Sequence, residues 1–469
     1  MRKRELGARQ FSSDEPLVVG SNLKLSPTSK RMSANTDKPK IVYLTAGAGG
    51  MFCGSCMHDN ALSRSLEKTG WDIQLIPTYT PIRTDEQDAS VDQVFFGGIN
   101  VFLQQKIPFF RWLPNSMDRF LDNPKLIRRV TAKAMDTDAK TLGKLAVSML
   151  KGVDGNQRKE VRRICQWLAT TQPQLMIFSN ILIGGCIEAI KKQLELPIVV
   201  TLQGDDVFLD SLQEPFRSQA LKRIEDIGKH VDAFVVHSEF YRDYICDYMN
   251  LEKDKFHVTP LGLELEDYEP FRGIRQSSAP DGQTIGYLAR LAPEKGLHYL
   301  VDAFIGLKKD PRFESLRLRI AGWLSPQNKS YADSLFAKLD DAGLKSHYEY
   351  VGAIERDEKL DFLRSLDLFS VPTEYLEPKA LYALEAMAAG LPVIAPDHGA
   401  FPELAKATEG IRLFAARDVD SLQNSIAVLA DDETLRQRIG QRGQASVFEH
   451  RNATVMARNT GDLLLEILE

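Results

Sequence analysis

Short apolar segments and amphipathic helical segments alternate along most of this 469-residue chain. Segments such as residues 41–45 and 198–202 are almost entirely apolar, which is typical of strands buried on both faces of a sheet. Helical stretches such as residues 60–68 and 186–194 lie between them, an order that predicts a parallel sheet covered by helices. The fold class is therefore predicted to be α/β. The expected strands are residues 41–45, 73–77, 175–179, 198–202, 233–237, 256–261, 284–289, 316–321, 348–352, 368–372 and 393–395.

The alternation pauses at residues 265–283, a polar stretch rich in Pro, Gly and Ser, and then restarts. A chain of this length is too long for one hydrophobic core, so two domains are expected. We predict two Rossmann-like, doubly wound parallel-sheet domains that face a cleft. The predicted parts are a disordered tail at 1–39, an N-terminal domain at 40–264, a linker at 265–283, a C-terminal domain at 284–450, and a terminal helix at 451–469 that packs back on the N-terminal domain.

Composition excludes several classes of protein. The net charge of −5 and the pI of about 6.0 give no basic field for nucleic acid. No apolar run approaches the ~20 residues of a membrane span, and the start of the chain lacks the apolar segment of a signal peptide. We expect a cytoplasmic protein without a transmembrane segment; peripheral membrane contact and oligomeric state stay open. Five cysteines, an odd number, argue against a disulfide scaffold.

Two glutamates mark the most informative segment of the chain. Glu377 precedes a short predicted helix that contains Glu385 and stops at Gly390, and an apolar strand follows. Backbone N–H groups at a helix start can hold a phosphate, and carboxylates can bind the hydroxyls of a sugar. The alternative is a surface cap plus a helix salt bridge, but Glu385 lies among apolar neighbours, where an unpaired charge is costly. The segment predicts a nucleotide-sugar site.

Arg290 and Lys295 lie in a loop between a predicted strand and a helix that starts near Gly296. Arg offers a planar fork and Lys a point charge, a pair suited to a diphosphate leaving group. The alternative is two solvated cations. That alternative is weakened because cations at a helix N-terminus are unfavourable without an anion.

Glycines Gly47, Gly49 and Gly50 follow the first predicted strand. They suggest dinucleotide binding, but the third glycine of a G-x-G-x-x-G motif would fall on Phe52, which argues against a NAD site. A flexible loop that lets the backbone approach a phosphate or a sugar is the preferred interpretation, and a plain tight turn is the alternative.

Cys53 and Cys56 form a C-x-x-C in the same connection. A helix N-terminus lowers thiolate pKa, so this pair is the strongest signal for a redox function. A structural pair, or incidental redox sensitivity, is the preferred interpretation.

Two D-x-D triplets, Asp136/Asp138 and Asp418/Asp420, resemble metal-binding motifs of some sugar transferases. Neither follows a strand of a nucleotide fold, and Asp is a common helix cap. Both are interpreted as structural, and no metal is predicted.

Polar residues also follow strands of the first half. Asp205 and Asp206 could orient or deprotonate an acceptor hydroxyl. Asn180 and Gln203 lie at equivalent strand ends, and His58 follows the glycine loop. All five are acceptor-side candidates. His237 also ends a strand but is interpreted as structural.

The chain resembles retaining glycosyltransferases of family 4, the group 1 glycosyl transferases with the GT-B fold. The resemblance covers roughly residues 40–469 and is strongest over 256–404. It rests on Pro260-Leu-Gly-Leu-Glu264, Gly286…Arg290…Lys295-Gly296, Ala321-Gly322, Val351-Gly352, Glu377-x₇-Glu385-Ala-Met-Ala-Ala-Gly-Leu-Pro-Val-Ile and His398-Gly-Ala-Phe-Pro-Glu403.

The resemblance implies roles for individual residues. Arg290 and Lys295 would hold the donor diphosphate, Glu377 the hydroxyls of the donor sugar, and Glu385 the ribose. The leaving phosphate would help to deprotonate the acceptor, so no side-chain nucleophile is needed. The catalytic candidates are Glu377, Arg290, Lys295 and Asp205. The donor-binding candidates are Gly49, Gly50, Arg290, Lys295, Gly322, Val351, Ala353, Ile354, Glu377, Lys379, Ala380, Leu381 and Glu385.

The sequence departs from the family pattern at two places. Family members often have Gly-Phe-Gly after the first glutamate, where this chain has Pro378-Lys379-Ala380. Lys379 adds a cation beside the sugar or diphosphate, which changes the expected donor preference. Many members also carry a histidine where this chain has Gln203, so a histidine role is not carried over.

We therefore expect a metal-independent, retaining hexosyltransferase that moves a hexose from a UDP- or GDP-linked donor to an acceptor hydroxyl of a carbohydrate or another molecule. No cofactor is expected beyond the nucleotide diphosphate sugar, which is the donor substrate. Two alternatives stay open. One is an epimerase or phosphorylase on the same fold, and the other is a non-catalytic, redox-sensitive sugar-nucleotide binder that uses Cys53 and Cys56.

Overall fold

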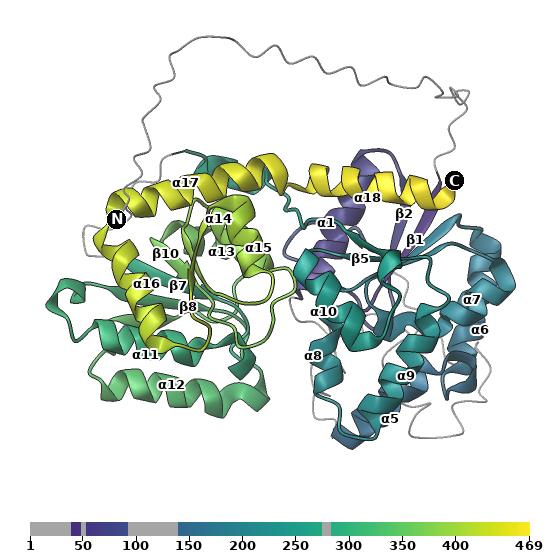
Figure 1. The fold of residues 1–469 in the computed structure, drawn as a ribbon, viewed down its shortest axis with the longest axis horizontal. Coiled ribbons are helices and arrows are strands. Elements are labelled where there is room, and N and C mark those ends of the chain that lie inside the picture. The colour runs from purple at the N-terminus through teal and green to yellow at the C-terminus, as the bar shows by residue number, and fades with distance from the viewer. Residues whose placement is uncertain (1–38, 48–52, 92–138, 274–282) are drawn as a thin grey trace, which may run out of the picture. The chain divides into compact units, whose positions relative to one another are not determined.

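The computed structural model describes residues 39–47, 53–91, 139–273 and 283–469 (Figure 1). The described residues all lie within one compact unit, Lys38–Glu469. Within them the strands form two six-stranded sheets in which every pairing is parallel. The predicted α/β class with two doubly wound parallel sheets is therefore confirmed.

The N-terminal sheet has the strand order β2-β1-β3-β4-β5-β6. The chain starts in the interior of the sheet at β1, pairs β2 on one side, and then continues outward from β3 on the other side. The strands are β1 (Lys40–Thr45), β2 (Asp72–Pro77), β3 (Leu175–Phe178), β4 (Ile198–Thr201), β5 (Ala233–Val236) and β6 (Phe256–Val258). The helices are α1 (Gly54–Lys68), α5 (Ala139–Leu150), α6 (Arg158–Thr171), α7 (Ile187–Leu194), α8 (Asp205–Asp210), α9 (Phe216–Gly228) and α10 (Glu239–Met249).

The C-terminal sheet has the order β12-β11-β10-β7-β8-β9. Its strands are β7 (Thr284–Leu288), β8 (Arg317–Ala321), β9 (Tyr348–Tyr350), β10 (Leu368–Ser370), β11 (Val393–Pro396) and β12 (Ile411–Phe414). The helices are α11 (Leu297–Leu307), α12 (Lys329–Asp341), α13 (Arg356–Arg364), α14 (Leu381–Ala388), α15 (Phe401–Thr408), α16 (Val419–Asp431), α17 (Glu433–His450) and α18 (Ala453–Leu468). Short 3₁₀ segments are η2 (Gly152–Asp154), η3 (Ile181–Cys186), η4 (Lys253–Lys255), η5 (Glu266–Phe271), η6 (Pro293–Lys295), η7 (Pro311–Phe313) and η8 (Pro326–Asn328).

Strand β1 shows why these strands are apolar throughout. Ile41 and Tyr43 join one hydrophobic cluster, whereas Val42 and Leu44 join the cluster on the opposite face, and all four are fully or almost fully buried. Successive side chains of a strand point to opposite faces, so a strand covered on both sides needs an apolar residue at every position.

The two C-terminal helices connect the halves of the chain. Helix α17 packs against α14, and α18 packs against α1, as the yellow helices in Figure 1 show. Arg451 and Asn452 separate them, and Asn452 caps α18 by accepting a hydrogen bond from the backbone N–H of Val455 at 2.9 Å. Gly461 lets α18 approach Trp71, since a Cβ there would lie 3.2 Å from the indole nitrogen. The last helix therefore lies on the N-terminal half, while the exact domain boundaries stay predictions.

Each expected strand is present, with ends that differ by at most a few residues. Strand β12 was not expected, because its sequence Ile-Arg-Leu-Phe is short and only partly buried at its centre. No helix in the described part of the chain is both long and apolar enough to cross a membrane.

Candidate functional site

The four residues on which the site prediction depended, Arg290, Lys295, Glu377 and Glu385, all line one pocket. The pocket has a volume of about 680 Å³ and is lined by residues of both halves of the chain. It lies beyond the carboxyl ends of β1, β3, β4, β7 and β8, which is where parallel α/β sheets bind ligands. The sequence-predicted residues therefore converge, although their roles stay predictions.

Glu377 is buried, with 4% of its surface exposed, and it accepts four hydrogen bonds. The donors are Lys295 Nζ at 3.2 Å, the Tyr382 hydroxyl at 2.9 Å, the backbone N–H of Ala380 at 3.2 Å, and the Tyr375 hydroxyl. Burial alone would raise the pKa of Glu377, but Lys295 and the two hydroxyls outweigh it and lower the pKa below its usual value. Glu377 is therefore a carboxylate at neutral pH.

Lys295 lies beside this carboxylate and above two aromatic rings. Its Nζ donates to the Tyr375 hydroxyl at 2.6 Å and lies 4.5 Å and 5.0 Å from the ring centres of Tyr375 and Tyr382. Burial lowers the pKa of Lys295, and Glu377 opposes that shift. Arg290 is more exposed and pairs with Glu294 at 3.2 Å. Both cations line the pocket and could bind a diphosphate there, provided that Glu294 moves away from Arg290.

The backbone before α14 is tightly fixed. Ala380 has φ +52°, a left-handed conformation at the N-cap of the helix that costs energy for a residue with a Cβ. Gly399 passes so close that a Cβ would lie 2.7 Å from the backbone nitrogen of Glu377. The turn thereby brings the N–H of Ala380 to the Glu377 carboxylate, whereas the sequence predicted that N–H groups at this helix start would hold a phosphate.

Glu385 is also buried, but its partner is Lys359 of α13, at 2.7 Å. Lys359 Nζ simultaneously contacts Asp85, which lies in the segment after β2 of the N-terminal half. Burial alone would lower the pKa of Lys359, but Glu385 and Asp85 outweigh it and raise the pKa. Lys359 is a permanent cation that joins the two halves at the pocket.

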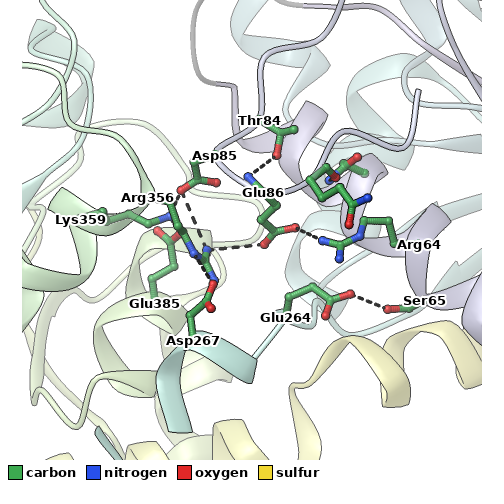
Figure 2. Close-up of polar contacts among 12 residues, drawn as sticks. Arg64, Ser65, Thr84, Asp85, Glu86, Glu264, Asp267, Arg356, Lys359 and Glu385 are labelled. Atoms are coloured by element: carbon green, nitrogen blue, oxygen red, sulfur yellow. Dashed lines mark hydrogen bonds and ion pairs between the residues drawn. The ribbon is translucent and has the colours of Figure 1, made fainter. Parts of the chain in front are cut away.

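Arg356 extends this cluster, as Figure 2 shows. Its guanidinium lies 4.0 Å from Asp85, 3.6 Å from Glu86 and 3.0 Å from Asp267. Glu86 also lies 3.9 Å from Arg64. Burial raises the pKa of Glu86 to about 7, in spite of Arg356. Sequence reasoning missed Asp85, Glu86, Arg356 and Lys359, because no local spacing marks them.

Gln203 and Lys379 meet across the pocket. Lys379 Nζ donates to Gln203 Oε1 at 2.5 Å and to Ser55 Oγ at 3.3 Å. Gln203 Nε2 in turn donates to Asp59 Oδ1 at 3.0 Å. Gln203 and Lys379 were both predicted, whereas Asp59 was not.

The cysteine pair begins α1, and Cys53 and Cys56 both line the pocket. The Cys56 thiol hydrogen-bonds Cys53, which, with backbone N–H groups and Lys379, lowers the pKa of Cys53 to about 5 against the effect of burial. The same contact and burial raise the pKa of Cys56. All five cysteines of the chain are free.

The carboxylates after β4, Asp205 and Asp206, have hydrogen-bond partners within the N-terminal half. Asp205 accepts hydrogen bonds from the backbone N–H groups of Ile181 at 2.9 Å and Gln203 at 3.1 Å, and Asp206 accepts one from the Tyr241 hydroxyl at 2.6 Å. Neither lines the pocket. Burial raises the pKa of Asp205 to about 7. The structure therefore gives Asp205 and Asp206 local partners, and their proposed role on an acceptor stays without geometric support.

His58 and His237 are both buried, and the centres of their rings lie 4.5 Å apart. His58 Nδ1 lies 3.1 Å from Asp59, and His237 Nδ1 lies 2.8 Å from the carbonyl oxygen of Thr259. Burial lowers the pKa of both. His58 does not line the pocket, in contrast to Asn180.

The other candidates divide into three groups. Gly49, Gly50 and the Asp136/Asp138 triplet lie outside the described residues. Asp418 caps α16 by accepting from the Ser421 N–H at 2.9 Å, as predicted, and no cluster of three potential metal ligands occurs in the described residues. Gly322, Ala353, Ile354, Lys379 and Leu381 line the pocket, whereas Val351 and Ala380 do not.

Part of the chain matches a known protein family. Residues 273–446 match the family described as glycosyl transferases group 1, which confirms the predicted resemblance at that level. A mannosylfructose-phosphate synthase of Agrobacterium fabrum is 26% identical over 179 residues, which is 37% of this chain and 39% of that protein. A phosphatidyl-myo-inositol mannosyltransferase of Mycobacterium leprae is 30% identical over 179 residues, 36% of this chain and 45% of that protein. The chain thus spans less than half the length of these two relatives.

Two solved structures resemble the chain over most of its length. Sucrose-phosphate synthase from Thermosynechococcus elongatus aligns with a TM-score of 0.66 at 18% identity, covering 91% of this chain and 99% of that one. Anabaena HepE in complex with UDP aligns with a TM-score of 0.63 at 15% identity, covering 91% and 100%. This likeness establishes the fold, which is GT-B.

Proposed function

We propose that the protein is a retaining, metal-independent glycosyltransferase of family 4, starting from the match of residues 273–446 to group 1 glycosyl transferases. It would transfer a hexose from a UDP- or GDP-linked sugar to an acceptor hydroxyl, in the cytoplasm. The observation that carries the proposal is the convergence of Arg290, Lys295, Glu377 and Glu385 on one pocket.

The chemistry of these side chains suits each part of the donor. Lys295 and Arg290 would neutralise the charge that develops on the leaving diphosphate. Removal of one such group typically lowers the rate by roughly 10²–10³. Glu377, kept ionised by Lys295, would accept hydrogen bonds from sugar hydroxyls. Glu385 would accept from the ribose through the oxygen that Lys359 does not contact. The leaving phosphate would take the acceptor proton.

The related structures support a nucleotide-sugar donor. HepE was solved with UDP, with UDP and glucose, and with UDP-glucose, and its fold is shared by this chain. The names of the sequence relatives indicate transfer to different acceptors, so the acceptor of this protein is not assigned from them.

A donor screen followed by product analysis tests the proposal. UDP, GDP and their hexose conjugates are compared for thermal stabilisation, since a bound donor raises apparent stability by mass action. Transfer is then followed with and without EDTA, and the anomeric configuration of the product is determined by NMR. We expect a stabilising donor, retained configuration and no effect of EDTA.

Arg290→Ala should reduce transfer by at least 10²-fold without unfolding the protein. Arg312→Ala is the matched control, because Arg312 is exposed and pairs with Asp310 away from the pocket. Full activity of Arg290→Ala, or an inverted product, would refute the corresponding part of the proposal.

A further inference from the structure

Lys379 differs from the other two lysines that line the pocket. Lys295 pairs with Glu377 at 3.2 Å, and Lys359 pairs with Glu385 at 2.7 Å. Among the described residues, no carboxylate lies within ion-pair distance of Lys379 Nζ, whose two hydrogen-bond acceptors are the uncharged Gln203 and Ser55. One pocket cation is thus left without a protein carboxylate.

The surrounding contacts hold the Lys379 ammonium in place. Gln203 Nε2 donates to Asp59 Oδ1 at 3.0 Å and to the carbonyl oxygen of Ser179 at 3.2 Å, so its Oε1 must face Lys379. Asp59 is fixed in turn by the hydroxyls of Tyr43 and Thr45, each at 2.6 Å. An ammonium has three protons, and these contacts use two. One N–H is left for a further acceptor.

An anion in the pocket would offset the cost of burying this charge. Burial lowers the pKa of Lys379, and the negative charges of Cys53, Asp59 and Glu377 only partly oppose it. Buried charges in proteins are normally paired or neutralised. Of these charges, that of the Cys53 thiolate opposes the shift most, and Cys53 also lines the pocket.

We propose that Lys379 binds an anionic group, a carboxylate or a phosphate, on a sugar substrate, so that the protein prefers a charged sugar to a neutral one. This inference rests on the proposed function. Lys379 follows Glu377 by two residues, and Glu377 is the group proposed to contact the transferred sugar. The anion is therefore either the carboxylate of a hexuronic acid donor or a phosphate on the acceptor.

Binding measurements with charged and neutral sugars distinguish the two sources. In the donor arm, calorimetry compares UDP-glucuronic acid and UDP-galacturonic acid with UDP-glucose and UDP-galactose. In the acceptor arm, glucose 6-phosphate is compared with glucose in the presence of UDP. We expect the charged sugar to bind about tenfold or more tightly in one of the arms, as hydrogen bonds to charged groups usually give.

Two substitutions assign that preference to Lys379. Lys379→Met should abolish the preference, measured as the ratio of the affinities for the charged and the neutral sugar, whereas Lys379→Arg should retain part of it. Lys329→Met is the control, because Lys329 is exposed, pairs with Asp333 and does not line the pocket. If Lys379 had only a structural role, Lys379→Met would weaken the binding of charged and neutral sugars equally.

The outcomes separate this inference from the proposed function. Binding of UDP without any preference for a charged sugar, or a preference that survives in Lys379→Met, would overturn the inference alone. Failure of the unmodified protein to bind UDP, GDP or any of their sugar conjugates would overturn the proposed function and the inference with it.

Discussion

Glu377 and Glu385 are both buried carboxylates paired with a lysine, but the lysine beside Glu385 also contacts an aspartate of the N-terminal half. Glu377 receives hydrogen bonds from Lys295, Tyr375, Tyr382 and the N–H of Ala380, all in the C-terminal half. Glu385 contacts Lys359, and Lys359 also forms an ion pair with Asp85 of the N-terminal half. The hydrogen-bond partners of Glu377 thus all belong to one sheet domain. The ion-pair cluster around Glu385 forms only where the two halves of the chain are in contact.

The largest expected difference concerns stability. Lys359→Met leaves Asp85 and Glu385 buried without their shared cation, a change that typically costs about 3–5 kcal/mol. Lys295→Met should cost less, about 1–3 kcal/mol, because three other donors still serve Glu377. Midpoints of urea unfolding measure both effects.

Lys338→Met provides the baseline for this comparison, since Lys338 is exposed and its partner Asp302 is only partly buried. It should change stability by no more than about 0.5 kcal/mol. If Lys295→Met proved as destabilising as Lys359→Met, the two carboxylates would not differ in the way the contacts indicate.

The second expected difference concerns activity. Glu377→Gln keeps the shape but removes the charge beside Lys295, so transfer should fall by roughly 10²–10³ in kcat. Glu385→Gln should chiefly raise the KM of the donor, by about tenfold, because a contact to the ribose is the same in the ground state and in the transition state. Steady-state kinetics with the donor found in the screen separate the two.

Glu374→Gln is the control for these kinetics. Glu374 precedes Glu377 in the same loop, contacts His298 at 3.1 Å and Tyr299 at 2.9 Å, and does not line the pocket. Its replacement should leave kcat and KM nearly unchanged. Equal losses of kcat in Glu377→Gln and Glu385→Gln would contradict the assignment of separate roles.

The same contrast explains what could be predicted from the sequence. The parallel sheets follow from apolar strands alternating with helices, and the positions of Lys295, Glu377 and Glu385 follow from motifs at the carboxyl ends of those strands. Each of these motifs is a short segment of the chain, so its residue types and spacing can be read from the sequence. Strand β12 was missed because a four-residue edge strand interrupted by Arg412 has no such periodicity.

Contacts between distant segments could not be predicted in this way. Lys359 and Asp85 are 274 positions apart, and Lys379 and Gln203 are 176 apart. Each residue type is ordinary on its own, and only folding gives it a partner. Asp205 shows the reverse case, because a carboxylate after a strand suggested a site, but the left-handed turn at Gly204, with φ +116°, places it against backbone N–H groups.

The smallest expected difference is a pH dependence confined to the cluster around Glu385. Glu86 has its pKa raised by burial from 4.5 to about 7, in spite of Arg356, and its other charged neighbours include Asp85, Lys359, Glu264 and Arg64. Between these two values the folded state binds more protons than the unfolded state, so the contribution of Glu86 to stability is lost as pH rises. At about 1.4 kcal/mol per pKa unit, the loss approaches roughly 3 kcal/mol by pH 8.

Glu86→Gln removes this dependence, so its stability relative to the unmodified protein should increase steadily from pH 5 to pH 8 in urea titrations. Glu377 gives the opposite pattern, because its pKa is lowered and its contribution is present above pH 4.5 and is lost only below it. The stability difference between Glu377→Gln and the unmodified protein should therefore stay flat over the same range. A flat difference for Glu86→Gln as well would mean that Arg356 and Arg64 keep Glu86 ionised, and that the carboxylates at the junction of the halves are as well satisfied as Glu377.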